Sequence, residues 1–252
     1  MAGRMEGKVL LISGSSGMAA ATARLAKAEG AAVLAIARHQ GELDDVFLGD
    51  LMDAATSRDA VRQCVDRFGR IDCLFNVAGI SARRVGDGPL HTCTEEAWDL
   101  TMNANVKSMF LLSREVLQVM LREPPAPNGQ RGVILNMASV ASTAPEPRYF
   151  DTHAYAISKG AVTAMTKVMA AYYAPQQIRV NAIAPALVKT RLTERSQQNP
   201  EILSYLRHKQ PLAEGMMEAD EIARAAVFLL SDESRMVTGE TLTIDAGWSV
   251  SS

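Results

Sequence analysis

The chain has 252 residues, 48% hydrophobic and 21% charged, a composition typical of a soluble globular protein. This length suits one large α/β domain covering residues 1–252, and the net charge of −2 argues against a nucleic-acid or anionic-membrane partner. The three cysteines lack metal-ligand spacing, so we expect no metal site and a reducing compartment. No apolar run approaches bilayer length, and residues 9–12 are too short a run for a signal peptide, so the expected location is the cytoplasm.

The first half of the chain alternates between predicted strands and helices. Aliphatic and β-branched runs indicate buried strands, and apolar residues at helical spacing indicate helices. The predicted strands cover residues 8–13, 31–37, 46–49 and 71–75, and the predicted helices cover 18–29, 56–68 and 94–123. Thr92, three residues before Glu95, predicts a capping box at the start of the third helix.

The second half continues the alternation. A strand at 133–138 leads into a loop at 140–152, and helices follow at 153–173 and 219–230 with strands at 178–183 and 240–244. Between them, the polar stretch at about 188–215 predicts a mobile helical segment over the substrate. The pattern has no repeats or linkers. It predicts a single doubly wound, Rossmann-type α/β domain with a mostly parallel seven-stranded sheet and helices on both faces.

A glycine turn, Gly14-Ser15-Ser16-Gly17, joins the first strand to the first helix. Glycines there let backbone N–H groups approach a pyrophosphate at the positive end of the helix. Any strand-to-helix turn can carry two glycines, so this signal needs support from elsewhere in the chain.

Tyr155 and Lys159 lie four residues apart on a predicted helix and therefore share one face. A free phenol has a pKa of about 10, and we expect the nearby ammonium to lower the pKa of Tyr155 toward the working range. Ser139 follows a predicted strand, so its hydroxyl would emerge at the carboxyl end of the sheet, where ligands bind. These groups suit proton transfer to or from an alcohol or carbonyl oxygen.

Several ordered motifs together resemble the classical short-chain dehydrogenase/reductase family over residues 5–250. The motifs are Asn76-Val-Ala-Gly79, Asn105-Val-Lys-Ser-Met-Phe110, Asn136-Met-Ala-Ser139, Tyr155-x-x-x-Lys159, Arg179-Val-Asn-Ala-Ile-Ala-Pro185 and Asp245-Ala-Gly247. Residues 74–79 and 136–142 also resemble the type 2 3-hydroxybutyrate dehydrogenase branch.

The resemblance implies an NAD(P)-dependent oxidoreductase for a secondary alcohol or ketone, including a small hydroxy acid. Tyr155 would be the general acid/base, Lys159 would tune its pKa and bind the ribose, and Ser139 would hydrogen-bond the substrate oxygen. Asn105 would hold a water that relays the proton through Lys159. Because the nicotinamide takes the hydride while Tyr155 takes the proton, no metal is required.

The resemblance also implies the lining of the cofactor site. Its members are Ser13, Gly14, Ser15, Ser16, Gly17, Met18, Arg38, Asp50, Leu51, Asn76, Ala78, Gly79, Tyr155, Lys159, Pro185, Val188 and Thr190. An acidic side chain at the end of the second strand would bind the ribose of NAD. Ala37 stands there instead, and Arg38 follows with a fork suited to a 2′-phosphate, so we expect NADP to be favoured over NAD. The alternative is an ordinary surface arginine.

Two departures affect the adenosine and pyrophosphate half of this site. The glycine turn is one residue shorter than the family's, with Ala19 in place of the last glycine. The chain between Arg38 and Asp50 is also short, with room for only a turn of helix around residues 42–45. A second hypothesis is therefore a catalytically silent dinucleotide-binding or scaffold protein.

The substrate and the assembly are predicted mainly by the same resemblance. Arg148, Arg195 and Lys209 lie in segments expected to wall the pocket and would favour an anionic substrate, unless they are solvated surface charges. The family implies a homo-oligomer, most plausibly a tetramer. Four apolar residues of the long helix fit either an interface or the core: Met109, Leu111, Leu112 and Val116.

Overall fold

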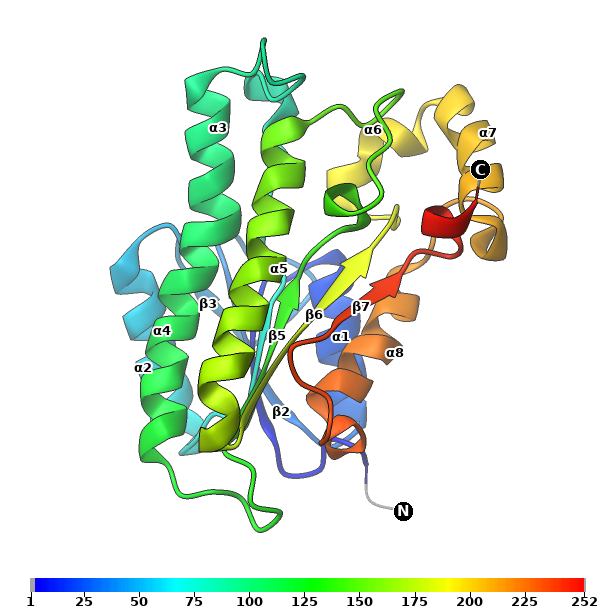
Figure 1. Ribbon diagram of the computed structural model, residues 1–252. Coiled ribbons are helices and arrows are strands. Elements are labelled where there is room, and N and C mark those ends of the chain that lie inside the picture. Colours follow the sequence, from blue (N-terminus) through cyan, green and yellow to red (C-terminus); the bar gives the residue numbers. More distant parts are fainter. Residues whose placement is uncertain (1–2, 252) are drawn as a thin grey trace.

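The computed structural model describes residues 3–251 and contains a seven-stranded sheet whose neighbouring strands are all parallel (Figure 1). The strands are β1 (Val9–Ser13), β2 (Ala32–Ala37), β3 (Val46–Leu48), β4 (Cys73–Asn76), β5 (Gly132–Met137), β6 (Ile178–Pro185) and β7 (Thr241–Ile244). Their order is β3-β2-β1-β4-β5-β6-β7, so the direction of winding reverses between β1 and β4. The predicted doubly wound fold is confirmed.

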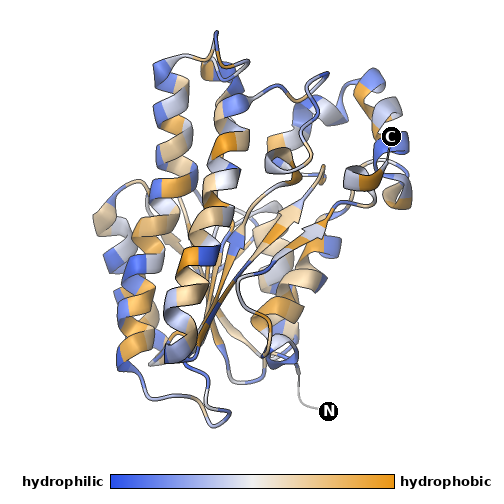
Figure 2. Ribbon diagram, in the orientation of Figure 1, coloured by the Kyte–Doolittle hydropathy of each residue, from blue (hydrophilic) through white to orange (hydrophobic). Residues whose placement is uncertain are grey.

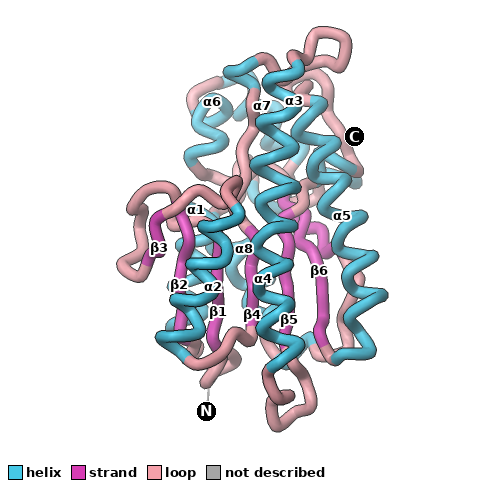
Figure 3. The backbone as a smooth tube through the Cα atoms, turned by 90° about the vertical axis from the view of Figure 1, so that its left-hand side faces the viewer, coloured by secondary structure: helices cyan, strands magenta, loops and turns pink. Residues whose placement is uncertain are grey.

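Helices cover both faces of this sheet (Figures 1 and 3). The main helices are α1 (Gly17–Ala28), α2 (Ala54–Phe68), α3 (Glu95–Met102), α4 (Ser108–Arg122), α5 (His153–Tyr173), α6 (Glu194–Gln197), α7 (Pro200–Lys209) and α8 (Ala219–Leu230). Helices α1 and α8 pack on one face, and α2, α4 and α5 pack on the other. Helices α6 and α7 lie beyond the carboxyl ends of the strands, where a ligand of such a sheet would bind.

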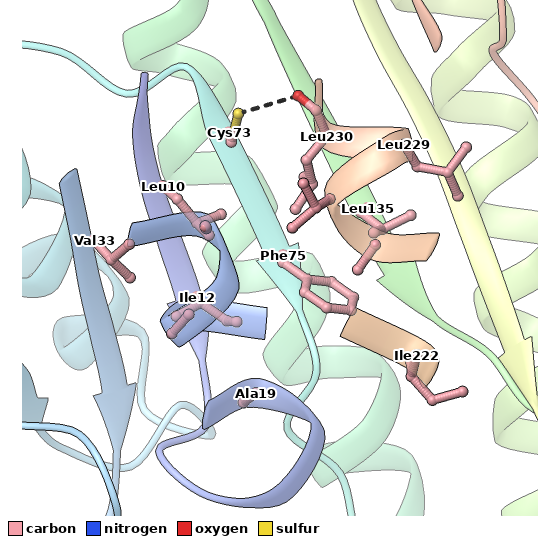
Figure 4. Packing of buried hydrophobic residues seen from close by; sticks show 14 of the residues in the cluster. Leu10, Ile12, Ala19, Val33, Cys73, Phe75, Leu135, Ile222, Leu229 and Leu230 are labelled. Carbon is pink, nitrogen blue, oxygen red and sulfur yellow. Dashed lines mark hydrogen bonds between the residues drawn. The ribbon is translucent and has the colours of Figure 1, made fainter. Parts of the chain in front are cut away.

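Alternate side chains of β1 feed the two layers, as the period of a strand requires. Leu10 and Ile12 join Phe75 in the cluster under α1 and α8 (Figure 4), whereas Val9 and Leu11 join the cluster under α2, α4 and α5. Hydrophobic colour gathers on the strands and on the sheet-facing sides of the helices (Figure 2). Burial on both faces explains why the strands read as continuous apolar runs.

The predicted long helix at 94–123 is interrupted. A π-helical segment at Asn103–Lys107 separates α3 from α4. The N-cap is Thr94, whose hydroxyl accepts from the Ala97 amide at 3.1 Å, while the Thr92 hydroxyl donates to the Pro89 carbonyl. The capping box expected at Thr92 was therefore wrong, because a turn at residues 89–92 occupies that hydroxyl.

The structure also bears on three other expectations: the short helical turn, the four apolar residues of the long helix and the segment at 188–215. Residues 38–45 form an irregular loop and not a helical turn. The four apolar residues offered as core or interface are all core, with exposed fractions of 5% or less: Met109, Leu111, Leu112 and Val116. The segment at 188–215 is helical as predicted, and its mobility stays a prediction. Its base is held by Gln210, which is fully buried and hydrogen-bonds the backbone of Leu187 and Gly215.

Two kinds of feature are absent from the residues that the structure describes. Between residues 3 and 251, no helix combines the length and apolar character needed to cross a bilayer. Over that range, no three His, Cys, Asp or Glu side chains gather as a metal site would require.

Candidate active site

The four residues predicted to be catalytic come from three neighbouring parts of the fold. Ser139 lies just beyond β5, Tyr155 and Lys159 are on α5, and Asn105 is in the π-helical segment. Helix α5 packs along β5 and β6, which brings its first turns to the carboxyl edge of the sheet (Figure 1). The structure thus gathers all four at the end where α/β sheets bind ligands.

Lys159 is almost completely buried, with 2% of its surface exposed. Its Nζ donates to the Met137 carbonyl at 2.8 Å and lies 5.7 Å from the centre of the Tyr155 ring. Burial lowers the pKa of Lys159 to about 8, because a desolvated ammonium loses its hydration.

Tyr155 differs from the expectation in one respect. Burial raises the pKa of its phenol, and a side-chain hydrogen bond with Ser139 acts in the opposite direction. The predicted lowering by Lys159 is therefore not found, since Nζ is directed to the Met137 carbonyl and desolvation outweighs the other effects. A phenol with a raised pKa holds its proton at neutral pH and is a weaker acid than a free tyrosine.

Asn105 is fully buried within the π-helical segment. Its Oδ1 accepts from the Ile80 amide at 2.8 Å, and its Nδ2 donates to the Ile80 carbonyl and to Ser158 Oγ. Both amide hydrogens are thus used, and one lone pair of Oδ1 remains for a further donor. A Cβ added at Gly79 would lie 3.0 Å from that Oδ1 and 3.4 Å from Lys159 Nζ, so both groups border the space beside Gly79.

Two residues predicted to bind cofactor serve internal contacts instead of presenting polar atoms to a ligand. Ser13 Oγ accepts from the amides of Val77 and Ala78, and Asn76 Nδ2 donates to Ser113 and Asn136. Each is 2% exposed. These contacts fix the backbone that leads to Gly79 and so support the site without contacting a ligand.

The glycine turn has the backbone that a phosphate site requires, but a side chain occupies it. Gly14 and Gly17 have φ of 103° and 55°, in the region that favours glycine. The Gly17 amide donates to Glu42 Oε1 at 2.8 Å, and Arg24 Nη1 donates to Glu42 Oε2 at 3.0 Å. The Glu42 amide also donates to the Ser15 carbonyl at 2.7 Å. A carboxylate therefore holds the helix N-terminus that would otherwise attract a pyrophosphate.

The remaining predicted cofactor residues surround this turn or the sheet edge. Arg38 is exposed and forms no ion pair or side-chain hydrogen bond with any residue of 3–251. A Cβ at Gly17 would lie 3.2 Å from Thr190 Cγ2, so Thr190 faces the turn from the other side. Those that are buried are Ser15, Leu51, Pro185 and Val188, and those partly or fully exposed are Ser16, Met18, Asp50 and Ala78. The catalytic half fits a nicotinamide cofactor, and the pyrophosphate half fits once Glu42 moves aside.

The three basic residues expected to bind substrate do not converge on one point. Arg195 donates to the Tyr149 carbonyl at 2.7 Å, and the Arg148 guanidinium lies 5.1 Å from the Tyr149 ring centre. Lys209 donates to the Ser251 carbonyl and lies 5.9 Å from the Trp248 ring centre. Arg195 and Lys209 thus already bind backbone carbonyls, whereas the Arg148 guanidinium lies over the Tyr149 ring and has no hydrogen bond or ion pair with residues 3–251.

An aromatic cluster, which the sequence analysis missed, joins the segments above the sheet edge. It consists of Tyr149, Phe150, Tyr205 and Trp248. Trp248 Nε1 donates to the Ala144 carbonyl at 2.9 Å. The cluster packs α7 and the C-terminal turn against the loop before Tyr155. Aromatic residues in loops have no periodicity, so no pattern marked them.

Comparisons with known proteins agree with this geometry. The sequence profile of the family described as Enoyl-(Acyl carrier protein) reductase matches residues 12–249. The chain is 36% identical to dehydrogenase/reductase SDR family member 6 of Xenopus laevis, covering 98% of this chain and 100% of that protein. It is 34% identical to the 3-oxoacyl-[acyl-carrier-protein] reductase of Thermotoga maritima, covering 97% of this chain and 98% of that protein.

A solved structure has the same fold. The aldohexose dehydrogenase of Thermoplasma acidophilum superposes with a TM-score of 0.87 at 26% identity, covering 100% of this chain and 98% of that one. The chain therefore belongs to the classical short-chain dehydrogenase/reductase family, whose oxidoreductases use a nicotinamide cofactor.

Proposed function

We propose that the protein is an NADP-dependent reductase of a small ketone, with the secondary alcohol as product. The observation that carries this proposal is that Ser139, Tyr155 and the buried Lys159 gather at the carboxyl edge of the sheet, with Lys159 Nζ 5.7 Å from the centre of the Tyr155 ring. Two hydroxyls there can bind one carbonyl oxygen. The family supports the oxidoreductase class, and a relative that is 34% identical and is a reductase supports the reductive direction that we propose.

Each residue has one task in this scheme. Ser139 donates to the substrate oxygen and orients it, and Tyr155 donates the proton as negative charge develops on that oxygen. A nicotinamide, when bound, supplies the hydride to the carbonyl carbon. A water on Oδ1 of Asn105 would return a proton through Lys159, since both groups border the space beside Gly79.

The protonated Tyr155 would serve as the acid in ketone reduction, and its phenolate would serve as the base in the reverse oxidation. The choice of NADP rests on Arg38, which stands exposed at the end of β2 without a carboxylate partner among the described residues. A guanidinium fork matches a 2′-phosphate in shape and charge.

A carboxylate on the substrate is the narrower part of the proposal, and Arg148 supports it. This side chain lies on the loop before Tyr155, is exposed, and makes no ion pair within residues 3–251. Arg148→Ala should then raise KM for a 3-oxo acid more than for a neutral ketone of similar size. Equal increases in KM would remove the carboxylate from the proposal.

Self-association is also proposed. Apolar side chains stay exposed on α4 and α5, among them Phe110 at 48%, Val168 at 67% and Tyr172 at 70%. Covering them would be favourable. We expect a homo-oligomer, most simply a tetramer, in sedimentation at micromolar concentration, and a monomer there would contradict it.

The competing function is a dinucleotide-binding or scaffold protein without turnover. The bond between Glu42 and Gly17 favours it, because a carboxylate on the turn opposes a pyrophosphate. A screen of small 3-oxo acids, cyclic diones and ketones with NADPH and NADH distinguishes the two. NADPH-dependent consumption of a ketone supports the reductase, whereas NADPH binding without turnover across the panel supports the competing function.

A further inference from the structure

Helix α5, which carries Tyr155 and Lys159, has no side-chain cap of its own. Thr152 stands at the N-cap position, and its side chain caps no amide. The first amides of a helix have no partner within the helix and must be satisfied from outside. At α5 they are satisfied by a loop more than sixty residues earlier in the chain.

Asp87 supplies most of this distant cap. Its Oδ1 accepts from the Ala154 amide at 2.9 Å, and its Oδ2 accepts from the Tyr155 amide at 3.1 Å. The Gly88 carbonyl accepts from the His153 amide at 3.2 Å, and the Leu90 amide donates to His153 Nδ1. The Ala156 amide donates to the Thr152 carbonyl, so each of the first four amides of α5 has a hydrogen-bond acceptor.

Capping α5 with the Asp87 carboxylate costs free energy, because the charge is buried. Asp87 is 3% exposed and forms no ion pair with the residues of 3–251, so its charge is compensated mainly by the two amides and the positive end of the helix. A local Ser or Asp at position 152 would cap the helix without burying a charge at a distance. A second role for this contact, beyond stabilising the helix, would balance the free-energy cost of burying the carboxylate.

The same loop connects the two halves of the candidate site. It begins after Gly79, whose backbone borders Asn105 and Lys159, and it reaches α5 at Tyr155. Arg83 adds an ion pair to Asp151 at 2.6 Å beside the same junction. The backbone of Tyr155 is thus tied to the segment that follows β4.

We propose that Asp87 is a positioning residue for the reaction, which sets the place of Tyr155 relative to the nicotinamide side of the site by holding the first amides of α5. This inference rests on the proposed function. The bidentate bond fixes both the axial position and the rotation of the first turn, and proton transfer is sensitive to small displacements of the donor.

The experiment compares Asp87→Asn with Asp151→Asn. The first change is isosteric but places an NH₂ group against one helix amide, while the second removes a carboxylate that binds Arg83 and no amide of the helix. Three quantities are measured: kcat with NADPH and the best ketone of the screen, the Kd of NADPH by fluorescence, and hydrogen–deuterium exchange of residues 152–158. Should Asp87→Asn not fold, Asp87→Ser keeps one acceptor and takes its place.

For Asp87→Asn we expect kcat to fall about tenfold or more with the Kd of NADPH changed by less than about threefold, and faster exchange confined to the start of α5. Asp151→Asn should change kcat by less than about threefold. Unchanged kcat in the Asp87 variant would overturn the inference, as would parallel loss of NADPH binding with faster exchange throughout the chain. Faster exchange at α5 in a protein whose wild type turns over no ketone would contradict the proposed function and still support Asp87 as the anchor of the helix.

Discussion

The Gly17 amide and the Glu42 carboxylate are 2.8 Å apart, a hydrogen bond that closes the glycine turn with the protein's own anion. Glu42 reaches the turn because residues 38–45 fold back onto it: a Cβ on Gly41 would lie 2.4 Å from the Ser15 carbonyl oxygen. The short turn and the short loop after β2 are thus one packed unit. A dinucleotide must displace Glu42 before its pyrophosphate can reach this amide.

Removing that carboxylate should strengthen cofactor binding. Glu42→Ala leaves the Gly17 amide open to the pyrophosphate and removes a negative charge from its neighbourhood, so we expect the Kd of NADPH to fall by about threefold or more. The matched control is Asp44→Ala, a change of an exposed carboxylate in the same loop. Weaker binding in the Glu42 variant, or equal tightening in both, would show that Glu42 does not compete with the cofactor.

The buried ammonium of Lys159 should lower the free energy of unfolding at neutral pH. Burial lowers its pKa from 10.5 to about 8, so below pH 8 the folded protein holds a buried ammonium that the unfolded chain would solvate. Between about pH 8 and 10.5 the folded state releases this proton before the unfolded state does, and stability rises with pH.

Lys159→Met therefore should raise the free energy of unfolding at pH 7 by up to about 3 kcal/mol, at about 1.4 kcal/mol per pKa unit. The gain is partly offset by the lost bond to the Met137 carbonyl. Urea unfolding at pH 7 and pH 10 measures it, and the difference between variant and wild type should shrink at the higher pH. A variant less stable than wild type at pH 7 would refute the argument.

Arg38 should govern the choice of cofactor. Arg38→Ala removes a charged hydrogen bond worth about 1.5–3 kcal/mol to a 2′-phosphate, and it should weaken NADPH binding selectively. Binding of NADPH and NADH to both proteins is compared by fluorescence, with Arg58→Ala on α2 as the control. Equal weakening of both cofactors, or a wild-type preference for NADH, would contradict the assignment.

The sequence predicted the centre of the sheet because β1, β4, β5 and β6 are buried along their whole length and read mostly as apolar runs of strand length. Three short motifs carry Asn105, Ser139, Tyr155 and Lys159, and the structure brings these four residues to one edge of the sheet, while their catalytic roles stay predictions. The sequence analysis missed Glu42 and Asp87, whose partners lie 25 and 67 residues away in the chain. Polar loop residues follow no period, so only the folded backbone reveals which amides they meet.

The direction of the pKa shift of Tyr155 was predicted wrongly for a related reason. Spacing on a helix put Lys159 on the same face, but it could not show that Nζ would bond to the Met137 carbonyl or that the phenol would be desolvated. Both effects depend on burial, which spacing along one helix does not determine.

The most direct test of the proposed function is NADPH-dependent ketone reduction by wild type and Tyr155→Phe, with the Kd of NADPH measured for both. The substitution keeps the ring and removes only the hydroxyl. We predict measurable turnover by the wild type, a loss of about a thousandfold or more in kcat for the variant, and a Kd of NADPH changed by less than about threefold. Turnover by Tyr155→Phe within about tenfold of wild type would contradict the role of Tyr155 as the proton donor.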